Sequence, residues 1–230
     1  MMIDIHSHIL PLVDDGSQSF EESIEMLKIA ERSGVKHQIL TPHVQSSVTK
    51  VKPEAYQPIF DELKLRAKDA GIQIELHLGC ELHYRSHIEP DYERFSLNQS
   101  KYVLIEFPFS RHSPIEDVVF DLSRSGYYPV VAHVERYEYL NYADFKKIKD
   151  AGGILQVNTH SILGLNEKVQ KKTILKMLED KLIDIVASDT HNTTSRKPNM
   201  NEAYHYLKSI VDPNYLEDMF YNNALKIIKT

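Results

Sequence analysis

The sequence is poor in cysteine and has no long apolar segment. Cys80 is the single cysteine, so an internal disulfide is excluded and a reducing compartment is expected. No segment approaches the ~18 consecutive apolar residues that a membrane-spanning helix requires, so we expect no membrane insertion. The first residues lack the basic region and apolar stretch of a secretion signal. We therefore expect a cytoplasmic protein.

An excess of basic residues is also missing. The 27 lysines and arginines are outnumbered by 33 aspartates and glutamates, which gives a net charge of −6. Domains that bind duplex nucleic acid usually carry a basic face. Nucleic acid is therefore not favoured as a partner.

Several common catalytic motifs are absent. There is no Gly-x-Ser-x-Gly elbow, no P-loop and no Gly-x-Gly-x-x-Gly turn. The segment from Cys80 to Arg85 lacks the spacing and the glycines of a thiol phosphatase loop, and the adjacent Glu81 would raise the pKa of a thiol. We interpret Cys80 as a small buried residue.

Short apolar segments alternate with helical patterns along the chain. Ser19 and Glu22 have the spacing of a capping box, and Gly34 is placed to end the helix that they begin. Strands separated by helices imply βαβ units and a parallel sheet, so we expect one α/β domain over residues 1–230. The predicted strands are Met2–Ile5, His37–Leu40, Ile72–Leu78, Tyr102–Phe107, Tyr128–Ala132, Ile154–Val157 and Ile183–Ala187.

Potential metal ligands follow six of the seven predicted strands. In parallel barrels the carboxyl ends of the strands meet at one mouth, so these residues should converge there. A lone histidine or glutamate at a strand end is more often simply solvated, but buried carboxylates without basic neighbours need another positive charge. The candidate ligands are His6, His8, Asp15, His43, Glu81, Glu106, His133, Asp189 and His191.

The composition of this set points to a cluster of divalent ions. Imidazoles with carboxylates suit manganese, iron or zinc. The chain lacks the set of cysteine thiolates that a structural zinc or iron–sulfur site would use. The set is too large for one ion, so we expect two or three. Three divalent ions would outweigh the four carboxylates by two positive charges and attract a dianion such as a phosphate monoester.

Two arginines lie close to these ligands in sequence. Arg136 follows His133 by three residues, and Arg196 follows His191 by five. A guanidinium group at the mouth would bind phosphate oxygens with two parallel hydrogen bonds. On spacing alone, either could instead be an ordinary surface residue.

All the candidate ligands except Glu81 lie in six short motifs. The motifs are Asp4-Ile5-His6-Ser7-His8, Val13-Asp14-Asp15-Gly16, Thr41-Pro42-His43, Leu104-Ile105-Glu106-Phe107, Ala132-His133-Val134-Glu135-Arg136-Tyr137 and Ser188-Asp189-Thr190-His191-Asn192. Together they resemble the polymerase-and-histidinol-phosphatase (PHP) superfamily. More narrowly, the chain from about residue 2 to 225 is similar to the manganese-dependent tyrosine phosphatases of bacterial capsule and exopolysaccharide operons, the CpsB/YwqE type.

The resemblance implies a distorted TIM-like (β/α)7 barrel with a trinuclear site. One ion would be held by His6, His8, Glu81 and Asp189, a second by Glu81, Glu106 and His133, and a third by Asp15, His43 and His191. Arg136 and Arg196 match the phosphate-binding arginines of the family. Val44 departs from the pattern, because many relatives carry a basic residue there.

The resemblance also implies the activity. We expect a phosphotyrosine-protein phosphatase that uses metal-activated hydroxide, with Asp15 or His43 as a candidate proton donor to the tyrosyl oxygen. The expected partner is a bacterial tyrosine kinase, and the process is capsule or exopolysaccharide production. A small-molecule phosphatase such as histidinol phosphatase is the alternative; a nuclease module fits the charge less well, and a scaffold would not need these ligands. The sequence leaves the oligomeric state open.

Overall fold

The computed structural model describes residues 1–88 and 90–229, and its strands follow the predicted order. It has nine strands within these residues instead of the seven predicted, because a short additional strand follows each of two predicted strands, His43–Val44 after the second and Glu81–His83 after the third. The strands are β1 (Met2–Asp4), β2 (Val35–Leu40), β3 (His43–Val44), β4 (Glu75–Leu78), β5 (Glu81–His83), β6 (Tyr102–Glu106), β7 (Tyr128–Val131), β8 (Ile154–Asn158) and β9 (Ile185–Ala187).

The strands form a curled, wholly parallel sheet in two hydrogen-bonded parts. One part has the order β1-β2-β4, and the other has the order β3-β5-β6-β7-β8-β9. The break falls at Pro42, which has no N–H to donate, and at Gly79, where a Cβ would lie 2.8 Å from the Leu97 side chain. The structure therefore confirms a curled parallel α/β sheet, in two segments that each have their own ladder, and the distorted (β/α)7 barrel stays a prediction.

The two ends of the curl meet just beyond β1 and β9. The amide of Asp189 donates to His6 O over 2.9 Å, and the amide of His8 donates to Thr190 O over 2.8 Å. An isolated parallel bridge joins Ser7 to Thr190. These bonds bring residues more than 180 positions apart in sequence to one place.

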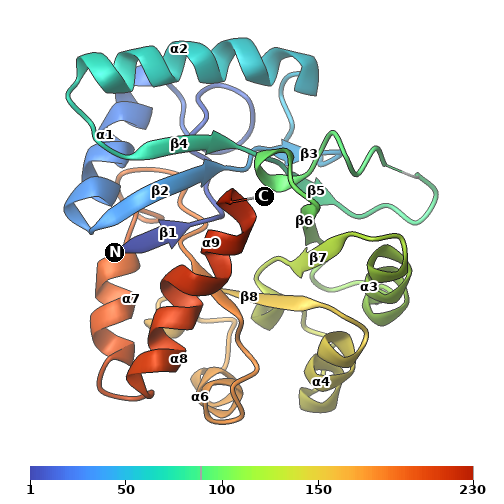
Figure 1. The fold of residues 1–230 in the computed structure, drawn as a ribbon. Coiled ribbons are helices and arrows are strands. Elements are labelled where there is room, and N and C mark those ends of the chain that lie inside the picture. Colours follow the sequence, from blue (N-terminus) through green and yellow to red (C-terminus); the bar gives the residue numbers. More distant parts are fainter. Residues whose placement is uncertain (89, 230) are drawn as a thin grey trace.

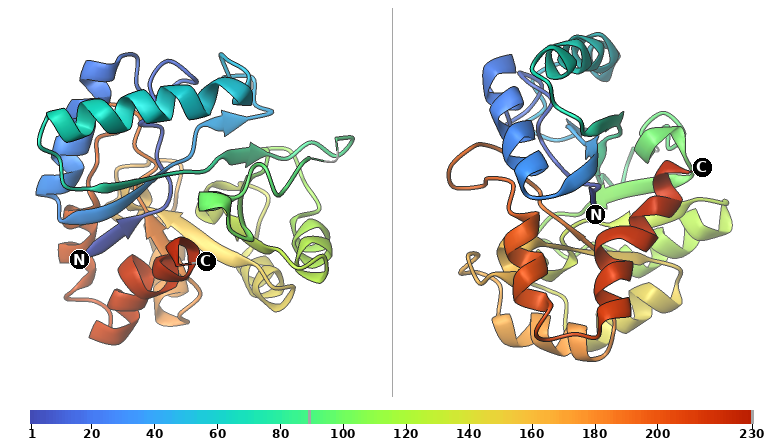
Figure 2. Two further views of the ribbon diagram at one scale, coloured as in Figure 1. Left: turned by 45° about the horizontal axis from the view of Figure 1, so that its top comes forward. Right: turned by 60° about the vertical axis from the view of Figure 1, so that its left-hand side comes forward.

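Helices cover the outside of the curl (Figures 1 and 2). α1 and α2 lie beside β2 and β4, and α7 to α9 close the other side (Figure 1). The helices are α1 (Phe20–Arg32), α2 (Tyr56–Asp69), α3 (Ile115–Arg124), α4 (Tyr142–Asp150), α5 (Thr159–Ile162), α6 (Lys171–Glu179), α7 (Met200–Leu207), α8 (Pro213–Glu217) and α9 (Asn223–Ile228). Shorter turns are η1 (Pro53–Ala55), η2 (Leu97–Gln99), η3 (Val134–Arg136) and the π-helical η4 (Asp218–Asn222).

The start of α1 has the predicted cap but not the full capping box. Ser19 caps the helix by accepting from the amide of Glu22, as predicted. The Glu22 carboxylate instead accepts from the amide of Gln18, one residue before the capping-box position. Gly34 follows the helix with φ +86°, a conformation that favours glycine.

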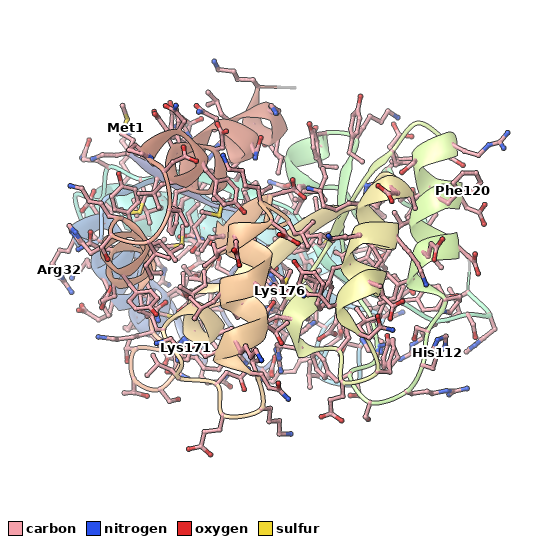
Figure 3. The ribbon with its side chains drawn as sticks, turned by 90° about the horizontal axis from the view of Figure 1, so that it is seen from below. Met1, Arg32, His112, Phe120, Lys171 and Lys176 are labelled. Carbon is pink, nitrogen blue, oxygen red and sulfur yellow. The ribbon has the colours of Figure 1, made fainter. Side chains whose placement is uncertain are left out.

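Apolar side chains fill two regions, one on each face of the sheet. The larger lies between the sheet and the outer helices, and helix surfaces facing solvent carry residues such as Lys176 and the exposed Phe120 (Figure 3). The smaller region draws on strands from both ends of the sheet, so it fills the hollow of the curl, and α9 covers it. Its members are Ile3, Ile5, Ile39, Leu97, Leu104, Val130, Ala132, Ile185, Ala187, Ala224 and Ile227. No helix in the described part of the chain is both long and apolar enough to cross a membrane.

Candidate metal centre

All nine predicted ligands meet at the carboxyl ends of the strands. Eight of them are buried, and the side chain of Asp15 is 44% exposed. They come from the segment after β1 (His6, His8), the loop before α1 (Asp15), β3 (His43), β5 (Glu81), the end of β6 (Glu106), the turn after β7 (His133) and the segment after β9 (Asp189, His191). The predicted convergence is confirmed.

Glu81 lies at the middle of the group. Its carboxylate oxygens are 2.9 Å from His43 Nδ1 and from His133 Nε2. They are also 3.4 Å from His6 Nε2 and 3.3 Å from His8 Nε2. A carboxylate that faces four imidazoles at these distances is suited to bridge two ions.

The other three carboxylates lie around Glu81. Asp189 Oδ1 is 3.5 Å from His6 Nε2 and 3.4 Å from His8 Nε2. Each remaining carboxylate also faces imidazoles. Their distances are 3.7 Å from Asp15 to His43, 3.6 Å from Asp15 to His191, and 3.6 Å from Glu106 to His133.

Within this centre, four groups of side chains have ligand atoms within 4.8 Å of one another. The groups are His8-Asp15-His43-His191, His6-His8-Glu81, His6-His133-Asp189 and His43-Glu81-Glu106. The first contains the predicted third set, and the others divide the remaining ligands differently from the prediction. How the nine residues are shared among ions therefore stays a prediction.

The unpaired atoms in the centre fit a divalent metal. His43 Nδ1 and Glu81 Oε2 are buried and 2.9 Å apart, yet neither makes a hydrogen bond of acceptable geometry. A buried polar atom without a partner is costly, and a carboxylate oxygen with an imidazole nitrogen is a favourable ligand pair. A cation between these atoms would satisfy both.

Hydrogen bonds on the far side of the ligands orient them toward the centre. Asp14 accepts from His8 Nδ1 over 2.7 Å, which directs His8 Nε2 toward the centre. Asp14 also accepts from the amide of His43 over 3.0 Å and from the amide of Gly16 over 2.9 Å. The role of Asp14 was not predicted, because sequence alone does not distinguish it from its neighbour Asp15.

β8 contributes two further positioning residues that the sequence analysis missed. The Gln156 side-chain oxygen lies 3.1 Å from His6 Nδ1 and accepts from the amide of His133 over 2.8 Å. Asn158 Nδ2 donates to Asp189 over 2.7 Å. The available signal was that two amide side chains alternate in an otherwise apolar strand, which ends at Asn158 and not at the predicted Val157.

His83 is another residue that had no predicted role. Its Nδ1 lies 2.8 Å from Glu106 Oε2, and its side chain lines the same cavity as the ligands. His83 therefore holds the Glu106 carboxylate in place from the solvent side.

Two ligands have a left-handed backbone. His133 has φ +33° and Asp189 has φ +51°. Residues other than glycine adopt this backbone conformation at a cost of about 1–3 kcal/mol, and such residues cluster at functional sites. The left-handed backbone directs both side chains from the strand ends into the centre.

Charge interactions between the ligands outweigh the effect of burial. Burial alone would raise the pKa of the Glu81 and Asp189 carboxyls, but the surrounding histidines, and Arg196 beside Asp189, lower both pKa values well below the usual range. Burial alone would lower the pKa of His8, but Asp14 and the other carboxylates raise it well above the usual value. The carboxylates are thus kept ionised, as metal ligands must be.

His191 behaves in the opposite way. Burial and the neighbouring charge on His8 lower its pKa to about 4. Its Nδ1 lies 2.9 Å from the carbonyl of Asp189, to which it donates. His191 is therefore neutral at pH 7 and presents Nε2 toward Asp15.

Both predicted arginines reach the mouth of the centre. Arg196 Nη2 is 2.8 Å and Arg136 Nη1 is 3.6 Å from Asp189 Oδ2. The Arg136 guanidinium lies 4.1 Å from the centre of the Phe109 ring, which supports it from one side. These three side chains and most of the ligands line a cavity of about 240 Å³.

The comparisons with known proteins agree with this geometry. A sequence model of the family described as capsular polysaccharide synthesis, CpsB/CapC, matches residues 2–229. The chain belongs to the CpsB/CapC family. The match spans almost the whole chain, including every ligand of the centre.

Two tyrosine-protein phosphatases are similar to this protein over most of its length. The tyrosine-protein phosphatase YwqE of Bacillus subtilis is 37% identical over 214 residues, which are 90% of this chain and 84% of YwqE. The tyrosine-protein phosphatase CpsB of Streptococcus pneumoniae is 33% identical over 240 residues, which are 99% of this chain and 98% of CpsB.

Solved structures extend the comparison to the fold. The crystal structures of YwqE from Bacillus subtilis and CpsB from Streptococcus pneumoniae, described as metal-dependent tyrosine phosphatases, match with a TM-score of 0.90 and 34% identity. That match covers 99% of this chain and 94% of the other chain. A variant of organophosphorus hydrolase matches with a TM-score of 0.65 at 8% identity, which shows a shared fold alone.

Cys80 and Val44 do not line the cavity. Cys80 is buried, as predicted, and burial raises the pKa of its thiol to about 12. Val44 is fully buried in the larger apolar region and is not among the residues that line the cavity. Its side chain packs against the core and does not face the mouth.

Proposed function

We propose that this protein is a metal-dependent phosphoric monoester hydrolase that removes phosphate from phosphotyrosine in proteins. The observation that carries this proposal is the group of nine candidate ligands, eight of them buried, which opens into a cavity flanked by two arginines. The names of the relatives, tyrosine-protein phosphatases, support phosphotyrosine as the substrate.

The cofactor we propose is a cluster of two or three divalent ions. Manganese is the first candidate, and iron or zinc suits the same imidazole and carboxylate ligands. When bound, such ions activate water as a nucleophile and stabilise negative charge on phosphoryl oxygens. The residues that would hold them are His6, His8, Asp15, His43, Glu81, Glu106, His133, Asp189 and His191.

The arginines bind and orient the phosphate in this proposal. Asp189 now faces both guanidinium groups, so a phosphate dianion entering the cavity would offer them further acceptors. The Phe109 ring limits the movement of Arg136, because the guanidinium carbon lies over it at 4.1 Å from its centre. Arg136 and Arg196 thus hold the phosphoryl group against the ligands and stabilise its charge.

The leaving group makes a modest demand on the protein. A tyrosyl phenolate is already a tolerable leaving group, and Asp15 and His43 line the cavity from which it departs. We propose that one of these two residues, when it is not bound to an ion, delivers the proton to the tyrosyl oxygen.

The cellular role follows from the family. Its description as capsular polysaccharide synthesis supports a role in capsule or exopolysaccharide production. We propose a phosphorylated bacterial tyrosine kinase as the partner and the cytoplasm as the location. We also propose that residues 1–230 form one domain and that the curled sheet is a distorted TIM-like (β/α)7 barrel.

The test measures phosphate release from a phosphotyrosine peptide and from histidinol phosphate. Metal-stripped protein is resupplied with Mn²⁺, Fe²⁺ or Zn²⁺ in turn. We expect metal-dependent release from the peptide, reduced more than about 100-fold by His133→Ala, because loss of a direct ligand exceeds the effect of losing an outer partner. The exposed His205 provides the control, His205→Gln.

Two outcomes would contradict the proposal in different ways. Turnover of histidinol phosphate without turnover of the peptide would replace the substrate by the small-molecule alternative. No turnover of either substrate by folded, metal-loaded protein would overturn the hydrolase proposal.

A further inference from the structure

A second group of potential metal ligands lies at the other end of the sheet. His37 on β2 and Glu75 and His77 on β4 have ligand atoms within 4.8 Å of one another. His37 pairs with Glu75 in the ladder, and His77 is two residues further along the same strand. Since side chains alternate between faces, all three project from one face of the sheet.

This group is separate from the centre described above. His77 precedes Glu81 by four residues, and His37 precedes His43 by six. At about 3.3 Å per residue, these separations correspond to roughly 13 and 20 Å along the strands. The two groups have no residue in common.

The spacing of the ligand atoms suits one transition-metal ion. His37 Nδ1 and His77 Nε2 are 3.2 Å apart. Two nitrogens bound to one tetrahedral Zn²⁺ at about 2.0–2.1 Å lie about 3.3 Å apart, so little movement is needed. The Glu75 oxygens lie 3.5 Å from His37 Nδ1 and 3.8 Å from His77 Nε2.

A neighbouring loop already sets the tautomer of His77. Its Nδ1 lies 3.2 Å from Asn98 Oδ1, which only accepts hydrogen bonds, so Nδ1 carries the proton. The lone pair of Nε2 therefore points toward His37 and Glu75. This arrangement, with an outer acceptor behind a ligating imidazole, is common at metal sites.

Burial favours the neutral form that binds a metal. The His77 side chain is 9% exposed, and burial lowers its pKa from the usual value. The Glu75 side chain is 67% exposed and can turn to bring one oxygen to an ion. Glu75, His77 and Asn98 also line a surface cavity of about 450 Å³, through which an ion and its water can enter.

We propose that His37, Glu75 and His77 form a second site for a divalent transition metal of the zinc class. Two imidazoles and one carboxylate supply three ligands, and water completes the tetrahedral shell. The ion would tie β2 to β4 and, through Asn98, to η2. Because β4 is the edge strand of its segment of the sheet, this bond would strengthen a weak edge of the fold.

The ordinary alternative is a direct hydrogen bond between the two imidazoles. In that case His37 Nδ1–H donates to His77 Nε2, and no metal is involved. The two arrangements require the same resting geometry, so metal content is the property that distinguishes them.

The first test counts Zn²⁺ retained by the full chain after equilibration with excess Zn²⁺ and gel filtration. We expect the wild-type protein to retain one more equivalent than His37→Gln or Glu75→Gln. Glu75→Gln changes only an exposed side chain, so it should fold normally. His205→Gln, an exposed histidine on α7, should retain the wild-type amount.

The second test locates the ion directly. Crystals soaked in Zn²⁺ should show an anomalous peak between His37 and His77 that Glu75→Gln weakens. Equal Zn²⁺ content in the wild-type protein and both variants, or no peak at this position, would overturn the proposal. Neither readout uses phosphatase activity, so failure here leaves the proposed function untouched.

Discussion

Asp14 and Asp15 are adjacent acidic residues with different tasks. The Asp15 side chain is 44% exposed and faces His43 and His191 at the edge of the cavity. Asp14 is fully buried, and its two oxygens accept from one imidazole and two backbone amides. The difference arises from side-chain direction, because one residue faces the cavity and the other faces the loop behind His8.

The change Asp14→Asn tests the positioning role. An amide offers one accepting oxygen and turns N–H donors toward groups that already donate, so His8 loses its fixed orientation. We expect affinity for Mn²⁺ to fall by about 10–100-fold, measured by competition with a chelator. Glu25→Gln on the exposed face of α1 is the control; unchanged affinity in Asp14→Asn would show that His8 is oriented without Asp14.

At the scale of single elements, side-chain hydrogen bonds to backbone amides fix where a helix begins. At α4, Asn141 accepts from the amide of Ala143, and Asp144 accepts from the amide of Asn141, which forms a reciprocal capping box. The bond from the Asn141 amide, together with Lys147, lowers the pKa of Asp144 despite the opposing effect of burial. α4 packs Phe145 and Ile148 against the core, so its start is held by polar bonds and its length by apolar contacts.

The change Asp144→Asn tests this capping box as a function of pH. Because the pKa of Asp144 is lowered in the folded protein, its contribution is present above the unfolded pKa of about 4 and is lost as pH falls through the folded value. Solvent screens this group, whose side chain is 23% exposed, so we expect the free energy of unfolding to fall by only about 0.5 kcal/mol at pH 7.

Urea unfolding of metal-free protein measures the difference between wild type and variant. That difference should shrink below about pH 4. Asp150→Asn, on the same helix but outside the box, should not lower stability at pH 7. A difference between wild type and Asp144→Asn that does not change with pH would contradict this account.

At the scale of the whole molecule, the metal centre depends on the curl of the sheet. β1 and β9 are far apart in sequence, and the bonds between the segments that follow them place His6 and His8 against Asp189. The same closure gathers four carboxylates and five histidines into one centre, in which all but Asp15 are buried. Metal binding and folding should therefore be coupled, since the unfolded chain has no such site.

Metal removal tests this coupling. Free Mn²⁺ at about 100 times its dissociation constant adds about 2.7 kcal/mol of stability, which raises the unfolding midpoint of a domain of this size by about 5–10 °C. The measurement compares thermal unfolding in Mn²⁺ and in chelator, with far-UV circular dichroism to confirm that the metal-free protein is folded. His133→Ala should show a smaller rise; an equal midpoint in Mn²⁺ and chelator would contradict the coupling.

The sequence by itself determined the element order and which candidate ligands come together. Alternating apolar segments and helix signals predicted a parallel α/β sheet, and residues such as His6, Glu81 and His191 were found because parallel strands end at one edge. The start of α1 at Ser19 was also predicted, since a cap depends on residues only three positions apart.

Only the tertiary structure decided the rest. The division of the sheet into two segments was not predicted, and the break at Gly79 depends on its contact with the distant residue Leu97. The roles of Asp14 and Gln156 depend on which way a side chain points, and strand periodicity alone does not determine that direction in a loop. Local signals act over a few residues, whereas hydrogen-bond partners across the centre are brought together by the packing of the whole sheet.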